Sequence, residues 1–168
     1  MNDKEIATIL RGQLEVSCFA NLNFGEMFEH SVFCKARLDC VPHFADCIVD
    51  IKTCHDASDL DKLAWDCFKY GYHRQASHYL DMFNATLENT EGERDLFMFI
   101  FVECEPPFGV RKIMLTDEFI EAGKKEREEL MLLYVQCVNS DKWPLYPDKV
   151  SVLELPKRNI NRYVSETL

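Results

Sequence analysis

The stretch that decides the fold is Cys47-Ile48-Val49-Asp50-Ile51-Lys52, an apolar run that contains one acid and one lysine. Its length and its β-branched residues predict a largely buried strand over residues 47–52. Residues two apart on a strand point to the same face, so Asp50 and Lys52 are expected side by side. Such a pair is either a solvated ion pair on an edge strand or a buried functional centre, and the apolar neighbours favour burial.

The segments on either side of this strand predict an α/β (α+β) architecture, in which helices flank a mixed sheet. Apolar residues alternate over 14–20 and 32–38, with a loop over 21–30, and aromatic or β-branched runs indicate strands over 95–103 and 109–115. Helical spacing extends from an expected N-cap at Ser58 to Phe83, as two helices or one bent at Gly71. A further helix is expected from Thr116 to Ser140, then a short strand near 150–155.

Composition limits the classes of protein that fit. The chain has 168 residues, is 47% hydrophobic and has a net charge of -10, which predicts one domain over residues 1–168 and excludes binding of nucleic acid through bulk positive charge. No run approaches the roughly 18 apolar residues of a membrane span. The N-terminus does not resemble a signal peptide, so we expect a cytoplasmic protein with eight reduced cysteines, most of them buried.

A metal site is expected where two carboxylates approach each other. Asp39 ends the strand over 32–38, and Asp50 lies in the next strand. Two neighbouring carboxylates are costly to bury unless a cation neutralises them. Mg²⁺ takes oxygen ligands from one or two carboxylates and keeps several waters, and the main-chain carbonyl of Ile51 can add another oxygen. Lys52 would then lie near the attacking water or the scissile phosphate, as metal-assisted phosphodiester hydrolysis requires.

A second polar pair lies on the helix that follows. Gln75 and Tyr79 are four residues apart, so they share one helix face. An amide and a phenol placed there could contact a DNA backbone. The alternative interpretation is a polar helix face with one packed tyrosine.

Taken together, these segments resemble the PD-(D/E)XK nuclease superfamily. More narrowly, they are similar to the exodeoxyribonuclease VIII (RecE-like) nuclease domain of phages and prophages. The segments that carry the likeness are Arg37-Leu38-Asp39, Ile48-Val49-Asp50-Ile51-Lys52-Thr53, Asp56-Ala57-Ser58, Tyr70-Gly71-Tyr72-His73-Arg74-Gln75-Ala76-Ser77-His78-Tyr79, residues 97–107, Trp143-Pro144-Leu145-Tyr146-Pro147 and Leu155-Pro156-Lys157-Arg158. The resemblance thus covers about residues 14–158.

The resemblance implies a restriction-endonuclease-like core and a Mg²⁺-dependent exonuclease, with Mn²⁺ as a substitute. Such an enzyme degrades one strand of linear double-stranded DNA from a 5′ end and leaves 3′ single strands for a recombinase. Its partners would be DNA ends and a single-strand annealing recombinase, in a bacterial or phage-infected cell. Relatives form rings around DNA, so a homo-oligomeric ring is also implied.

The resemblance assigns roles to individual residues. Asp39 and Asp50 match the metal-binding acids, Lys52 the catalytic lysine, and Gln75 and Tyr79 the Gln-xxx-Tyr motif. Glu15 matches an earlier acidic position that acts through the metal or its waters, and His73 is a supporting residue beside the motif.

The chain also departs from this pattern. Related domains carry helices before the first strand, including a histidine that can ligate metal, whereas about 13 residues precede Leu14 here and none is a histidine. We therefore expect a member shortened at the N-terminus. The alternative is a catalytically weak or inactive relative that binds DNA ends or a recombination partner. An iron–sulfur relative would need a late cysteine group, and only Cys137 lies beyond Cys104.

Three further expectations concern the surface. Alternating charges over residues 124–129 predict a solvated helix face with i,i+4 ion pairs. The segment from Trp143 is expected to be a packed cap. A local cationic path for DNA would consist of Lys52, Arg74, Arg37 and Lys69.

Overall fold

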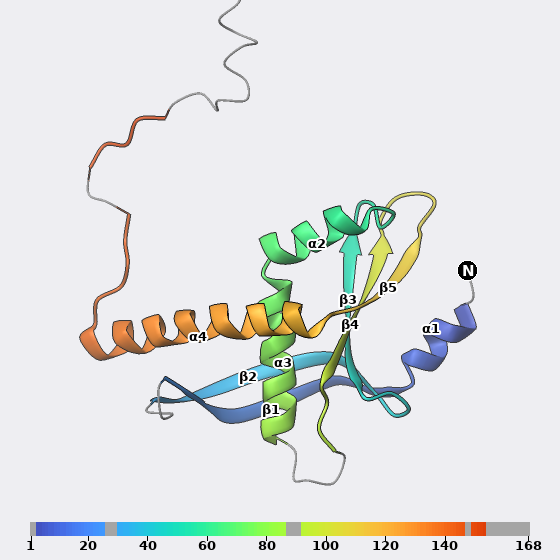
Figure 1. Ribbon diagram of the computed structural model, residues 1–168, viewed down its shortest axis with the longest axis horizontal. Coiled ribbons are helices and arrows are strands. Elements are labelled where there is room, and N and C mark those ends of the chain that lie inside the picture. Colours follow the sequence, from blue (N-terminus) through green and yellow to red (C-terminus); the bar gives the residue numbers. More distant parts are fainter. Residues whose placement is uncertain (1–2, 26–29, 87–91, 147–148, 154–168) are drawn as a thin grey trace, which may run out of the picture.

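The computed structural model describes residues 3–25, 30–86, 92–146 and 149–153 (Figure 1). These ranges contain four helices and five strands. In chain order they are α1 (Asp3–Ile9), β1 (Gly12–Phe24), β2 (His30–Pro42), β3 (Cys47–Cys54), α2 (Leu60–Lys69), α3 (Tyr72–Thr86), β4 (Leu96–Glu103), β5 (Val110–Met114) and α4 (Asp117–Ser140).

The strands form one mixed sheet in the order β1-β2-β3-β4-β5. β1 and β2 make a long antiparallel hairpin, β3 and β4 are parallel from Cys47↔Leu96 to Cys54↔Glu103, and β5 is antiparallel to β4. β2 and β3 are joined in register at Cys40↔Val49. The predicted α+β architecture, a mixed sheet flanked by helices, is therefore confirmed.

Helices cover both faces of the sheet, and each face has its own core. α3 lies across β1 and β2 with α4 beside it (Figure 1), and they cover the main core, which contains the fully buried rings of Phe97 and Phe99. On the opposite face, Val49 and Ile100 form a second core with Ile6 of α1. β3 is thus buried from both sides, as its apolar sequence predicts.

Two glycines fix where α3 lies. Gly71 separates α2 from α3 with a φ of 73°, a conformation that glycine adopts without strain, so the two-helix interpretation is correct. In α4, Gly123 lies against the main chain of His73, and a Cβ at this position would be 2.0 Å from the His73 carbonyl oxygen. Close approach of α4 therefore requires glycine there, and it sets the crossing of the two helices.

Several boundaries differ from the sequence expectations. β1 continues to Phe24 and β2 begins at His30, so residues 21–24 and 30 of the expected loop over 21–30 are strand, while 26–29 lie outside the described residues. The N-cap of α2 is Asp59 rather than Ser58, because its carboxylate accepts hydrogen bonds from the backbone N–H groups of Asp61 and Lys62. The helix α1 was not expected. Residues 150–153 are not a strand, and 154–155 lie outside the described residues.

The segment after α4 is not the packed cap that we expected. Trp143 lies 6.0 Å from the ring of Tyr134 but is 52% exposed. Leu145 and Tyr146 are almost fully exposed. This segment therefore adds little to the core in the described part of the chain.

All eight cysteines are free, and six of them are buried. Burial raises the pKa of the Cys67 thiol to about 11, so this thiol stays protonated and unreactive at neutral pH. Cys104 is exposed. Among the described residues, no helix combines the length and apolar character needed to cross a bilayer.

Candidate active site

The candidate site lies where β2 separates from β3. Just past the Cys40↔Val49 pair, a carboxylate oxygen of Asp39 accepts a hydrogen bond of 2.8 Å from the backbone N–H of Ile51. The Asp39 side chain thus replaces a strand partner for this N–H group. Leu38 and Cys40 pack in different cores although residues two apart on a regular strand share a face, so β2 is kinked at Asp39.

Asp50 is the buried acid of the site, with 2% of its surface exposed. Its Oδ1 accepts a 2.7 Å hydrogen bond from the Gln75 amide, and its Oδ2 lies 2.6 Å from the Lys52 ammonium. Burial raises the pKa of the Asp50 carboxyl and the charge of Asp39 adds to the rise, while Lys52 and Gln75 oppose it. The carboxylate is therefore held in an environment that resists its negative charge.

The Asp50–Lys52 pair is buried rather than solvated. The Lys52 side chain is 18% exposed, and its ammonium lies 4.7 Å from the ring centroid of Tyr72 and 5.7 Å from that of Phe99. These aromatic faces favour a cation at this position. The pair is therefore buried, as its apolar neighbours on the strand predict. The roles of Asp50 and Lys52 remain predictions.

α3 brings the two other motif residues to the same place. Gln75 bonds to Asp50, and one turn later Tyr79 packs 6.3 Å from the ring of Phe97. Burial raises the pKa of the Tyr79 phenol and the negative charges of Asp50 and Asp39 add to the rise, while a hydrogen bond with Gln75 opposes it. Asp39, Asp50, Lys52, Gln75 and Tyr79 therefore form one cluster.

The chemistry of this cluster suits a hard divalent cation. Asp50 Oδ2 is buried and accepts no well-directed hydrogen bond, because Lys52 approaches it only as an ion pair. With Asp39 and the Ile51 main chain nearby, the available ligands are oxygens. Across the described ranges there is no group of three or more His, Cys, Asp or Glu residues that could hold a metal. Two carboxylates are enough for Mg²⁺, because this ion keeps several waters in its coordination shell. An ion that needs a full set of protein ligands would fit this cluster less well.

Glu15 is not part of this cluster. Its carboxylate is 2.5 Å from the Arg37 guanidinium, and both side chains are more than half exposed. The backbone of Glu15 has a φ of 53°, and Glu15 lies between the Leu14↔Cys40 and Val16↔Leu38 pairs, opposite the kink of β2. Within the part of the chain that the structure describes, no hydrogen bond or ion pair joins Glu15 to Asp39 or Asp50.

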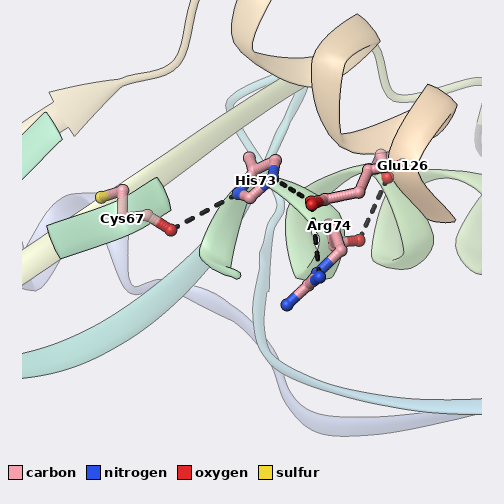
Figure 2. A network of polar contacts seen from close by, with 5 residues as sticks. Cys67, His73, Arg74 and Glu126 are labelled. Carbon is pink, nitrogen blue, oxygen red and sulfur yellow. Dashed lines mark hydrogen bonds and ion pairs between the residues drawn. The ribbon is translucent and has the colours of Figure 1, made fainter. Parts of the chain in front are cut away.

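His73 supports α3 instead of facing the acids. Its ring is 1% exposed and stacks on Phe68 at 4.2 Å. Figure 2 shows that one ring nitrogen points to Glu126 of α4, at 2.6 Å, and the other to the carbonyl of Cys67, at 3.4 Å. Arg74 adds a 3.4 Å ion pair with the same Glu126 carboxylate. This network joins the start of α3 to α4.

The charges of α4 are therefore only partly solvated. Glu126 bonds to His73, and Arg127 is 9% exposed and forms an ion pair with Asp81 of α3. The expectation of i,i+4 ion pairs along one helix is wrong for these two residues, because their partners come from α3. Lys124, Lys125, Glu128 and Glu129 are exposed, as expected.

The expected cationic path is already engaged within the protein. Its members contact the following groups: Lys52 the Asp50 carboxylate, Arg74 the Glu126 carboxylate, Arg37 the Glu15 carboxylate, and Lys69 the ring of Tyr70. A positive surface for a polyanion must therefore include other residues.

Sequence reasoning gave Tyr72 no role, yet it lies at the centre of the site. Tyr72 covers the Lys52 ammonium and also lines an open pocket of about 440 Å³ at the carboxyl ends of β3 and β4. Thr53 and Lys62 are among the other lining residues. The position of Tyr72 directly after the helix-separating Gly71 was the available signal, because the N-terminus of α3 must then face the end of β3.

The mixed five-stranded sheet with its flanking helices is the architecture of the restriction-endonuclease-like fold of PD-(D/E)XK proteins. The model of the family "PDDEXK-like domain of unknown function (DUF3799)" matches residues 1–156. The chain therefore belongs to this family.

Comparison with solved structures agrees on the fold. The crystal structure of a "Putative exonuclease" from Eubacterium rectale has a TM-score of 0.67 and 21% identity, over 92% of this chain and 57% of that one. The chain thus spans a little over half the length of that protein. The crystal structure of the protein SSO0001 is more distant, with a TM-score of 0.43 and 14% identity over 80% of this chain and 52% of that one. No curated protein matches.

Proposed function

We propose that this protein is a metal-dependent exodeoxyribonuclease that hydrolyses phosphodiester bonds of linear double-stranded DNA. The observation that carries the proposal is the Asp50 carboxylate, which is 2% exposed, bonded to Gln75 and paired with Lys52, and has one oxygen without a directed hydrogen bond. Burial disfavours the charged form of this acid and raises its pKa, so keeping the carboxylate ionised there reduces the stability of the fold. Such groups concentrate at functional sites. Membership of the PDDEXK-like family supports a nuclease.

Asp39, Asp50 and the main-chain carbonyl of Ile51 would hold the metal ion. The ion, Mg²⁺ or in its place Mn²⁺, would lower the pKa of water and withdraw charge from the phosphoryl group. Asp39 is already oriented by its hydrogen bond to the Ile51 N–H, and Asp50 by its bond from the Gln75 amide. The chain therefore presents two fixed carboxylates before any ligand binds, which lowers the cost of ordering them.

Lys52 would act on the substrate. Its ammonium is held between Asp50 and the ring of Tyr72, beside the open pocket that Tyr72 lines. The ammonium of Lys52 would stabilise a scissile phosphate bound at this opening as negative charge develops on the phosphate oxygens. Gln75 fixes the Asp50 side of the site by a direct hydrogen bond, and Tyr79 lies one turn further along the same helix.

The finer activity follows the RecE-like resemblance. It implies degradation from a 5′ end that leaves 3′ single strands. The same resemblance implies a recombinase partner and a homo-oligomeric ring, and we include both in the proposal.

The proposed activity predicts release of nucleotides from linear duplex DNA in Mg²⁺ or Mn²⁺, and none in EDTA. Substrates labelled at either the 5′ or the 3′ end give the polarity, and closed circular duplex of the same sequence is the substrate control. Lys52→Ala is expected to lower the rate by about a hundredfold or more, since one lost transition-state contact of this kind costs about 10²–10³ in rate.

Lys124→Ala is the matched control, because Lys124 is an exposed lysine of α4. It should digest linear DNA at the rate of the parent protein. Absence of nucleotide release by the parent protein across a Mg²⁺ and Mn²⁺ series would overturn the enzyme proposal. The protein would then be a relative that binds DNA without cutting it.

A further inference from the structure

One exposed face of the protein differs in composition from the rest of its surface. It is the outer face of the β1–β2 hairpin, opposite the face that α3 covers. We define the hairpin face by three successive cross-strand pairs whose six side chains are all exposed: Ser17↔Arg37, Phe19↔Lys35 and Asn21↔Phe33. Residues in register on an antiparallel pair point to the same side, so these six side chains form a continuous surface.

None of these six residues is acidic, although the protein has a net charge of -10. Of its two basic residues, Arg37 is paired with Glu15, whereas Lys35 makes no ion pair within the described residues. The remaining polar side chains, Ser17 and Asn21, are uncharged hydrogen-bonding groups. This strip is therefore electrostatically suited to a polyanion, which the acidic remainder of the surface would repel.

Two exposed aromatic rings lie at the centre of this strip. Phe19 is 57% and Phe33 is 69% exposed, and their rings stack with centroids 6.4 Å apart and an interplanar angle of 14°. Adjacent apolar rings rimmed by polar groups are typical of an interaction site. Nearly parallel rings on a sheet surface can stack with unpaired bases, as aromatic platforms of single-strand binding proteins do.

The position of the strip connects it to the candidate active site. Along β2, Phe33, Lys35 and Arg37 lie on one face and lead to the kink at Asp39, whereas Asp50 bonds to Gln75 on the α3 side of the sheet. Phe33 is six residues from Asp39, or about 20 Å along an extended strand. A chain of a few nucleotides bound on the strip would therefore extend to Asp39 at the kink.

We propose that the hairpin face binds single-stranded DNA that runs along β2 toward Asp39, with bases stacked on Phe19 and Phe33 and phosphates near Lys35. This inference rests on the proposed nuclease function and specifies which form of its substrate or product is held there. A single strand fits better than a duplex, because the bases of a duplex already stack on each other and do not expose their faces to a sheet surface.

The test measures binding separately from hydrolysis. A fluorescently labelled thymidine oligonucleotide is titrated with the full chain in EDTA, and its anisotropy gives Kd. The double variant Phe19→Ala/Phe33→Ala should bind at least about tenfold more weakly, the effect expected from loss of a single stacked base. Lys35→Gln should weaken binding of every oligonucleotide sequence and reduce the salt dependence by about one phosphate contact.

Phe44→Ala is the matched control, since Phe44 is 83% exposed in the turn between β2 and β3, outside the hairpin face. It should bind as the parent does. The substituted rings are exposed, and circular dichroism with thermal unfolding confirms that each variant is folded. Unchanged oligonucleotide affinity of the double variant overturns the inference. So does a parent dimer in sedimentation that the double variant dissociates without loss of DNA binding, because the face would then join two copies.

These results also separate the inference from the proposed function. If the double variant loses oligonucleotide binding while the parent releases no nucleotides in Mg²⁺ or Mn²⁺, the binding site is supported and the nuclease proposal fails. If the parent digests DNA and the double variant binds as well as the parent, the nuclease proposal holds and the inference fails.

Discussion

Asp50→Asn is expected to lower the rate of DNA hydrolysis by about a thousandfold and to remove a decrease in stability with rising pH that the metal-free parent shows. The asparagine keeps the size of the side chain and can still accept the hydrogen bond from Gln75. It removes the negative charge that a metal ion requires, and a loss of about 4 kcal/mol of transition-state stabilisation corresponds to about 10³ in rate.

The stability part of this prediction follows from the direction of the pKa shift. Burial holds the pKa of Asp50 above its ordinary value of 3.8, so the folded state binds this proton more tightly than the unfolded state does. The free energy of unfolding of the metal-free parent should therefore fall as pH rises from 3.8 through the raised pKa. Asp50→Asn lacks this titration and should not show that decrease.

Urea unfolding in EDTA at several pH values measures the stability, and nucleotide release from linear DNA measures the activity. Glu129→Gln, which neutralises an exposed acid of α4, is the control and should match the parent in both. A variant that keeps full activity would show that Asp50 is not a metal ligand. A variant that loses activity only because it unfolds would make Asp50 structural.

Lys52→Met is expected to destabilise the protein as well as to inactivate it. The change leaves the Asp50 carboxylate, 2% exposed, without its cation. Removing one partner of a buried ion pair costs about 3–5 kcal/mol, and we expect the lower end of this range because Lys52 retains some solvent contact. Methionine preserves the apolar stem that packs near Tyr72 and Phe99.

The double variant Asp50→Asn/Lys52→Met isolates the cause. Once Asp50 is neutral, loss of the lysine leaves no unpaired buried charge, so most of the lost stability should return. Urea unfolding of the parent, both single variants and the double variant at pH 7 completes the cycle. Equal destabilisation by Lys52→Met in both backgrounds would show that packing, and not charge compensation, explains the effect.

Short-range patterns predicted the parts of the site that lie on single elements. Alternation placed Asp50 and Lys52 on one face of β3, and helical spacing placed Gln75 and Tyr79 on one face of α3, where Gln75 reaches Asp50. The neighbouring position of Asp39 was also expected. The kink that turns its carboxylate to the Ile51 N–H was not, because it depends on where β2 separates from β3.

Contacts between elements explain most of the other differences. The charges of Glu126 and Arg127 resemble a solvated helix face in sequence, yet both bind residues of α3 because Gly123 lets the helices approach closely. The hairpin was predicted too short, because Asn21 and Asn23 are typical of loops. Both are exposed on β1 while Leu22 and Phe24 of the same strand are buried.

The short helix α1 had no clear sequence signal. It has seven residues, and its helical stability comes from packing of Ile6 and Ile9 against the second core rather than from its own propensity. Its place on the sheet face opposite α3 could therefore be found only once the sheet was known.

Anomalous diffraction from crystals soaked in Mn²⁺ tests the central claim most directly, that Asp39 and Asp50 form a metal-dependent hydrolytic centre. We predict one anomalous peak at coordination distance, about 2.1 Å, from a carboxylate oxygen of both residues, and no peak there in Asp50→Asn crystals soaked in the same way. A peak at other residues, or an unchanged peak in the Asp50→Asn variant, would contradict the account.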